Sequence, residues 1–155
     1  MKLTRASWLF AAVFAAALGI VVTGQQPAAT AVYTLEQAAA GRAAYDANCS
    51  ACHRSDLGGL NEAPQLAGGN FMNTWRERTT AELVTRIDQT MPPGNAGVVS
   101  QAMATDIAAF LMQANGAVAG NQRLMPATTA RIGDIGMRQT PPALAGGQEI
   151  GRAHV

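Results

Sequence analysis

The sequence contains little cysteine and histidine, which form disulfide bonds and zinc sites. Its 155 residues include two cysteines and two histidines, and one of these histidines, His154, stands next to the C-terminus. A structural zinc site needs four ligands, which the cysteine pair and the adjacent His53 do not complete. The formal net charge is +1. This balance does not indicate nucleic acid or an anionic membrane surface as a partner.

Both cysteines stand in one short motif, Cys49-Ser50-Ala51-Cys52-His53. Two cysteines separated by two residues and followed by histidine are the attachment motif for a c-type haem. Each thiol can add to one vinyl group of the porphyrin, and the histidine is held beneath the iron as its axial ligand. A redox pair of the thioredoxin type stands at a strand-to-helix turn, and no such pattern surrounds this one. The sequence therefore predicts one covalently bound haem c, attached through Cys49 and Cys52, with His53 bound to the iron.

The first 24 residues are typical of a secretory signal peptide. Lys2 and Arg5 provide the positive charge, residues 8–22 form an unbroken apolar run, and small residues precede Gln25. An uncleaved membrane anchor is the alternative, but the run is shorter than the ~20 residues that a spanning helix needs. The pattern predicts export to the periplasm, cleavage and no stable membrane span afterwards. Covalent haem attachment in bacteria also occurs outside the cytoplasm, in agreement with export.

After a short linker, residues 25–33, the sequence predicts a helix over 35–48. Thr34 is a suitable N-cap, and Gln37 stands where it could complete a capping box. Gly41 lies inside this helix, where glycine costs about 1 kcal/mol relative to alanine. We expect close approach of a second helix at Gly41, and a tolerated surface glycine is the alternative.

Two further helices are predicted over 80–90 and 101–115. Thr79 and Glu82 form a capping-box pair, and Ser100 is the expected cap of the last helix. Apolar periodicity gives the expected buried face of each helix. The face of the helix over 80–90 consists of Leu83, Val84 and Ile87, and that of the helix over 101–115 consists of Met103, Ile107, Phe110, Leu111 and Ala114. A shorter helical stretch contains Phe71, Met72 and Trp75.

The loop over 54–65 has no apolar period and should pass beneath the haem. A backbone carbonyl of Ala63-Pro64-Gln65-Leu66 could accept the Nδ1 proton of His53, which would orient the imidazole and make it a better donor to iron. Trp75 has two interpretations that the sequence does not separate. It could donate its indole N–H to a haem propionate, or it could only pack.

An electron-transfer haem needs a second axial ligand, usually methionine or histidine. His154 lies far out in the C-terminal region, so the candidates are Met72, Met91, Met103, Met112, Met125 and Met137. Met91 begins the segment Met91-Pro92-Pro93-Gly94, a loop between two helices that prolines stiffen, which lowers the entropy lost on ligation. We therefore predict Met91 as the ligand. The alternative is a core methionine and five-coordinate iron.

The predicted ligand pair favours electron transfer over catalysis. A thioether favours ferrous iron and raises the reduction potential, and two filled axial positions leave no site for oxygen or peroxide. The chain is therefore predicted to move single electrons and not to be an enzyme. A haem enzyme or gas sensor with an open distal site is the alternative.

From residue 117 to 155 glycine, proline, alanine, threonine and arginine dominate, and no amphipathic period survives. This composition predicts a disordered or linker-like tail. The predicted domain is therefore residues 34–116. A second alternative function is an interaction subunit whose tail binds a partner while the haem serves mainly structure.

Several of these segments together resemble a class I c-type cytochrome: Gly41 and Tyr45, the Cys49–His53 motif, Ala63-Pro64-Gln65-Leu66-Ala67-Gly68 and Met91-Pro92-Pro93-Gly94. The likeness covers about residues 33–116. It implies an all-α cytochrome c fold, a small helical domain wrapped around one haem. It also implies that Gly41 and Tyr45 meet the face around Phe110, that Pro64 supplies the carbonyl to His53, and that Met91 supplies the distal sulfur.

A more specific resemblance is to the cytochrome module of quinohaemoprotein (alcohol) dehydrogenases, which contain pyrroloquinoline quinone (PQQ). It rests on residues 70–75, 91–97, 113–116 and 128–134. It implies that the chain accepts electrons from a PQQ-dependent dehydrogenase and passes them to another cytochrome or a terminal oxidase. In fused members a stretch like the last of these leads into a propeller domain, which this sequence does not contain. A truncated relative, a fragment of a larger fused enzyme and a free-standing carrier remain open.

Overall fold

The computed structural model describes residues 31–135. The predicted signal peptide, Met137 and His154 lie outside the described residues. The elements are α1 (Leu35–Asn48), α2 (Ser50–His53), α3 (Gly69–Trp75), α4 (Thr80–Thr90), α5 (Gln101–Ala114) and the 3₁₀ helix η1 (Ile132–Asp134). Between residues 31 and 135 there is one isolated β-bridge and no strand, which confirms the all-α prediction. No helix in this part of the chain is long and apolar enough to cross a bilayer.

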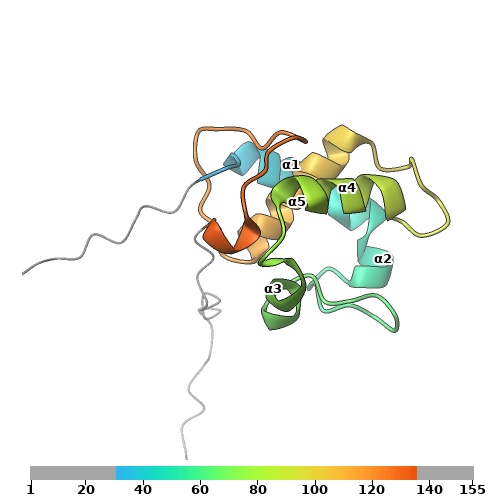
Figure 1. Ribbon diagram of the computed structural model, residues 1–155. Coiled ribbons are helices and arrows are strands. Elements are labelled where there is room, and N and C mark those ends of the chain that lie inside the picture. The colour runs from blue at the N-terminus through green and yellow to red at the C-terminus, as the bar shows by residue number, and fades with distance from the viewer. Residues whose placement is uncertain (1–30, 136–155) are drawn as a thin grey trace, which may run out of the picture.

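The centre of the fold is the crossing of α1 and α5 (Figure 1). A Cβ atom placed on Gly41 would lie only 1.8 Å from the backbone oxygen of Asp106 in α5. The two backbones therefore meet where a side chain on α1 would keep them apart, which confirms the interpretation of Gly41. One turn further along α1, the ring of Tyr45 packs 5.3 Å from that of Phe110.

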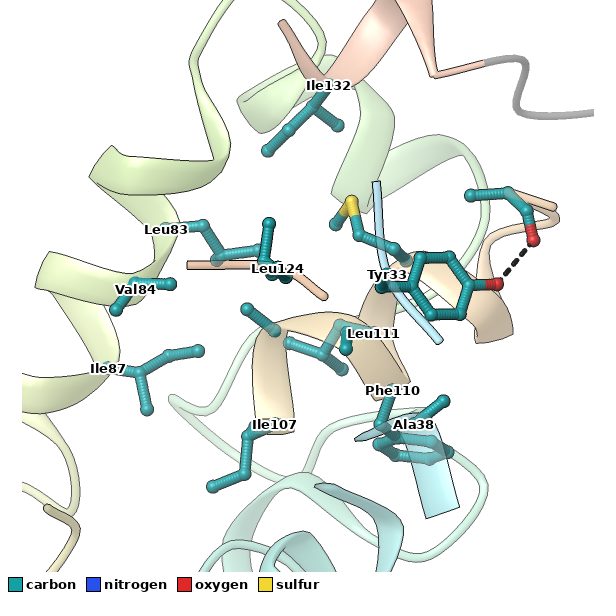
Figure 2. Packing of buried hydrophobic residues seen from close by; sticks show 14 of the residues in the cluster. Tyr33, Ala38, Leu83, Val84, Ile87, Ile107, Phe110, Leu111, Leu124 and Ile132 are labelled. Carbon is teal, nitrogen blue, oxygen red and sulfur yellow. Dashed lines mark hydrogen bonds between the residues drawn. The ribbon is translucent and has the colours of Figure 1, made fainter. Parts of the chain in front are cut away.

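Helix α4 packs on another side of α5 (Figure 2). Its N-terminus has the capping box predicted for Thr79 and Glu82, and its buried apolar residues are the predicted Leu83, Val84 and Ile87. The prediction for α5 was too narrow, because this helix is covered by both α1 and α4. Ala114 is exposed and Met103 is only partly buried, whereas other residues of α5 are buried, namely Ala104, Thr105, Ala108, Ala109 and Met112.

Residues 117–135 correct the expectation of a disordered or linker-like tail. They are irregular in backbone conformation but are packed against the helices, and Leu124, Ile132 and Ile135 are each no more than 1% exposed. Apolar periodicity does not reveal these residues because they belong to no long helix or strand. The packed unit therefore extends beyond residue 116, and residues 136–155 lie outside the described range.

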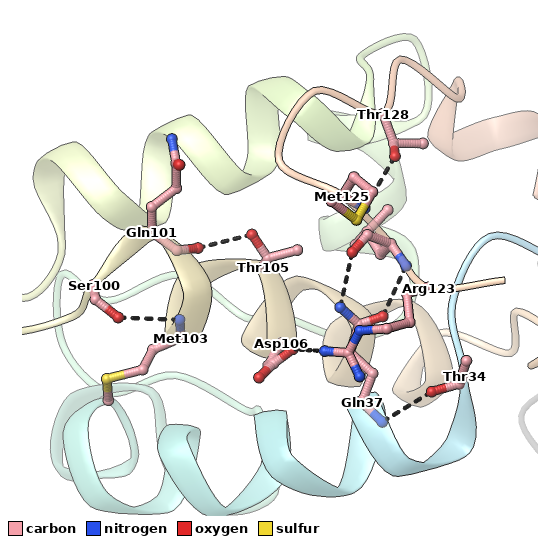
Figure 3. A network of polar contacts seen from close by, with 11 residues as sticks. Thr34, Gln37, Ser100, Gln101, Met103, Thr105, Asp106, Arg123, Met125 and Thr128 are labelled. Carbon is pink, nitrogen blue, oxygen red and sulfur yellow. Dashed lines mark hydrogen bonds and ion pairs between the residues drawn. The ribbon is translucent and has the colours of Figure 1, made fainter.

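The side chain of Gln37 holds this segment to α1 (Figure 3). Its Nε2 donates to the carbonyl oxygen of Leu124 at 2.9 Å, and its Oε1 accepts from the N–H of Leu124 at 2.8 Å. Thr34 caps α1 as predicted, but Gln37 does not complete a capping box because its amide is used by Leu124. The predicted linker 25–33 also contributes to the core, since Tyr33 is fully buried and its hydroxyl donates to Ala117 O at 2.6 Å.

The end of the segment is held by backbone hydrogen bonds around the start of α4. The N–H of Thr80 donates to Ala130 O, that of Ile132 to Arg78 O and that of Gly133 to Arg76 O, each at 2.9 Å. Residues 117–135 thus connect the end of α5 to the start of α1 and to the junction of α3 and α4. This segment fixes the positions of elements that form the candidate site.

Candidate functional site

The Cys49–His53 motif forms a tight corner after α1, and its last four residues make up α2. The N–H of Cys49 donates to Tyr45 O at 2.8 Å and ends α1, and the N–H of His53 donates to Cys49 O at 2.9 Å. The two cysteines form no disulfide, and Cys49 is half-buried whereas Cys52 is exposed. Burial, followed by the neighbouring Cys52, raises the pKa of the Cys49 thiol. The corner places both thiols and His53 on the wall of one cavity.

The cavity has a volume of about 650 Å³, within the range of cofactor sites. Much of its wall is apolar and comes from α4 and α5, through Leu83, Ile87, Ile107 and Leu111. Met91 and Pro92, from the loop after α4, lie on the same wall. Two free thiols, an imidazole and a thioether around an apolar cavity of this size are the donor set that a covalently attached haem requires. The residues present therefore fit a haem c.

His53 is buried, and its Nδ1 lies 2.9 Å from the carbonyl oxygen of Pro64. A carbonyl oxygen can only accept, so the proton of the neutral ring belongs on Nδ1, and Nε2 keeps its lone pair for a metal. The structure thus places the Pro64 carbonyl at hydrogen-bond distance from His53, the contact that the sequence predicts. Axial ligation of iron by His53 stays a prediction.

The loop that carries Pro64 folds back on the motif through backbone contacts. The N–H of Gly59 donates to His53 O at 3.0 Å, and the N–H of Leu66 donates to Leu57 O at 2.9 Å. Gly59 has a φ of +73°, and a Cβ there would lie 2.3 Å from Ala63 O. Glycine is therefore required for the loop to turn closely enough to bring Pro64 to the imidazole.

Met91 is the C-cap of α4, and its backbone is extended. Of the methionines within residues 31–135, Met91 lines the cavity, whereas Met72, Met103, Met112 and Met125 are not among its lining residues. Met112 is fully buried in the core and Met125 is 57% exposed. The structure therefore brings Met91 to the cavity that also contains His53. The iron–sulfur bond itself stays a prediction.

Trp75 also lines the cavity, and it is 9% exposed. Its ring stacks with Phe71 at a centroid distance of 6.3 Å, and the guanidinium of Arg78 lies 5.2 Å from its centroid. Trp75 therefore packs in the wall, and a bond from its indole N–H to a propionate stays a prediction.

Two charged residues of the cavity wall, Arg86 and Glu62, were not identified from the sequence. Arg86 stands three positions after Leu83, on the turn of α4 that faces the site. Helical spacing from Leu83 was the available signal. Glu62 lies in the irregular loop, where no periodicity points to the cavity.

Tyr45 forms part of the cavity wall, and its environment changes its acidity. Its hydroxyl donates to Arg54 O at 2.6 Å, just after the haem motif. Burial raises the pKa of Tyr45 to about 12. The hydroxyl therefore stays protonated, and able to donate to Arg54 O, well above the pH at which a free tyrosine ionises.

This pKa predicts a loss of stability at alkaline pH. Between pH 10, where a free tyrosine ionises, and about pH 12, the unfolded chain loses the Tyr45 proton while the folded chain keeps it, so rising pH favours unfolding. Tyr45→Phe should cost about 1 kcal/mol at neutral pH through the lost hydrogen bond. Its disadvantage should shrink as the pH rises over that interval. Urea unfolding of both holoproteins at a series of pH values measures this, and a constant difference would contradict it.

Comparison with known proteins adds a family match over most of the helical domain. Residues 36–111 match the family model described as cytochrome c oxidase, cbb3-type, subunit III. Among solved structures, a chain of the sulfane dehydrogenase SoxCD from Paracoccus pantotrophus is similar, with 30% identity and a TM-score of 0.45. The similarity covers 52% of this chain and 44% of that chain, so this sequence spans less than half of that chain. No curated protein matches.

Proposed function

We propose that this chain, whose residues 36–111 form a c-type cytochrome domain with covalently bound haem c, is a periplasmic single-electron carrier with His53 and Met91 as axial ligands. The domain itself implies electron transfer. The observation that carries the finer proposal is that His53, Met91 and both thiols line one cavity. Its electron donor is a PQQ-dependent dehydrogenase, and its acceptor is another cytochrome or a terminal oxidase.

The bound haem supplies a site that takes up and releases one electron at its iron. The protein residues set the conditions for this exchange. The Pro64 carbonyl holds the Nδ1 proton of His53 and so orients the ring. Met91 offers a soft, neutral sulfur that favours the ferrous state. The apolar side chains of α4 and α5 keep water and its high dielectric away from the site, which also favours the less charged state.

Electron exchange requires that a partner reach the edge of the site. Cys52 is exposed on the cavity wall, and Leu60, also on the wall, is 50% exposed. The wall is therefore open to solvent at this edge. A small apolar contact of this kind suits a transient complex, the low end of protein interface sizes. The donor class is supported by the resemblance of residues 70–75 and 91–97 to quinohaemoprotein modules, and the location by the signal-like residues 1–24.

Replacing the distal ligand tests the electron-carrier proposal. The oxidised parent should show the long-wavelength charge-transfer band of sulfur bound to ferric haem, and Met91→Ala should lose it. The reduced variant should then bind carbon monoxide readily, because one axial position is open. Absorption spectroscopy of the purified holoproteins measures both properties.

Met103→Ala is the matched control, since Met103 is a partly buried methionine of α5 that is not among the lining residues of the cavity. It should keep the band and should not bind carbon monoxide. If the parent lacks the band and binds carbon monoxide when reduced, the His53/Met91 assignment is wrong. The open-site enzyme or sensor would then be the better interpretation.

A further inference from the structure

Asn115, the C-cap residue of α5, is a buried amide whose hydrogen bonds reach the loop beneath His53. It is 8% exposed. Its Nδ2 donates to Leu66 O at 3.0 Å and to Leu111 O at 2.8 Å, and its Oδ1 accepts from the N–H of Gly68 at 2.9 Å. The contacts fix the orientation of the amide, because a flipped amide would face two acceptors with its oxygen and a donor with its nitrogen.

These contacts connect residues 57–68, here called the proximal loop, to a residue far along the chain. Within the described part of the chain, hydrogen bonds to residues 57–68 from more than 40 positions away come from Asn115 alone. The other hydrogen bonds of these residues join positions close along the chain, and include those from Gly59 to His53, from Leu66 to Leu57, between Pro64 and His53, and from Asn70 and Met72 of α3 to Gln65 and Gly68. These bonds let the loop, the motif and α3 move together, whereas Asn115 ties the loop to the central helix α5.

We propose that Asn115 is a positioning residue for the proximal histidine. By fixing Leu66, two residues after Pro64, and Gly68, it holds the Pro64 carbonyl on Nδ1 of His53. Through that hydrogen bond it sets how strongly the imidazole donates to iron. The inference rests on the proposed ligation by His53, and it assigns the control of that ligand to a residue 62 positions further along the chain.

The test compares two buried side-chain amides that both hydrogen-bond to the backbone of a distant segment. Asn115→Leu removes the anchor of the proximal loop. Gln37→Leu removes two bonds to the backbone of Leu124 and is the control, because Gln37 is 2% exposed and is not among the residues that line the cavity. Both variants should lose stability in urea unfolding of the holoprotein. Only Asn115→Leu should weaken the hydrogen bond between His53 Nδ1 and the Pro64 carbonyl oxygen.

Two measurements separate positioning from stability. NMR exchange of the His53 Nδ1 proton, corrected for each variant's loss of global stability, should be at least about tenfold faster in Asn115→Leu than in Gln37→Leu. The reduction potential of Asn115→Leu should rise, because a weaker donor stabilises ferric iron less. We expect at least about a threefold change in the ferric–ferrous equilibrium, which is about 28 mV at 59 mV per tenfold. Equal behaviour of the two variants in both measurements would overturn the proposal.

The parent holoprotein provides a test that does not depend on a variant folding. If Asn115 holds the loop, the Gly68 amide and the His53 Nδ1 proton should be exposed by the same opening and show protection factors within about tenfold of each other. A Gly68 amide that is more than about a hundredfold less protected would overturn the proposal. Absence of any haem-shifted His53 signal in the parent would instead contradict the ligation, and with it the proposed function.

Discussion

Gly41→Ala is expected to destabilise the holoprotein by about 3 kcal/mol or more, the upper range for overpacking a core. The added Cβ would lie 1.8 Å from the oxygen and 2.3 Å from the carbon of the Asp106 carbonyl group. Both atoms belong to the backbone of α5, so no side-chain rotation can make room and the helices must separate. The gain in helix propensity from glycine to alanine is only about 1 kcal/mol and does not offset this.

Gly69→Ala is the matched control, because Gly69 is also helical and a Cβ there would have no neighbouring atom within 4 Å. It should leave the free energy of unfolding unchanged or raise it by up to about 1 kcal/mol. Urea unfolding of the two holoproteins, followed by haem absorbance, gives both values. Similar small effects at the two positions would show that α1 and α5 do not depend on close backbone contact.

Helices of this domain were predictable where their ends and faces are set by local chemistry. Thr79 and Glu82 stand three positions apart and satisfy each other's backbone groups, so the start of α4 could be located from the sequence. Gly41 was informative for a different reason. A costly residue inside a helix needs compensation, and the crossing with α5 provides it.

Residues 117–135 could not be predicted because their bonds are not local. Gln37 had the spacing of a capping box, yet its amide binds Leu124, which is 87 positions away. Tyr33 likewise binds Ala117, 84 positions away. A sequence pattern reports what neighbours along the chain can do for one another. It does not show that an irregular segment without apolar periodicity will pack against the first helix.

In the candidate site too, local patterns could be predicted and distant contacts could not. The Cys49–His53 corner is one local turn, and Met91 stands at a helix end that prolines follow. Both could therefore be identified from the sequence as candidate site residues. Asn115 has an ordinary position at the end of α5, and the role proposed for it depends on a loop that begins about 60 residues earlier. The residues proposed to bind the cofactor thus stand in recognisable sequence patterns, whereas the residue proposed to position one of them does not.

The cysteine variants should have the other large effect, because the cavity is large for so small a domain. The cavity of about 650 Å³ is open to solvent at the Cys52 edge, so water would enter it if no group filled it. Contact of water with apolar walls is unfavourable. Leu83, Ile87, Ile107 and Leu111 would lose their contacts on the cavity side or face water. The walls formed by α4 and α5 therefore depend on a filled site.

Cys49→Ala and Cys52→Ala should each lower the yield of folded holoprotein by at least roughly tenfold, the factor that corresponds to about 1.4 kcal/mol. Each variant keeps one possible thioether but loses the second attachment that holds the group in place before the walls close. Ser50→Ala is the control in the same turn, since it removes only an exposed hydrogen bond to Asp46 O. Haem staining after denaturing electrophoresis, together with the absorbance of the purified protein, measures attachment and folding. Normal yields from both cysteine variants would mean that the fold does not need covalent attachment.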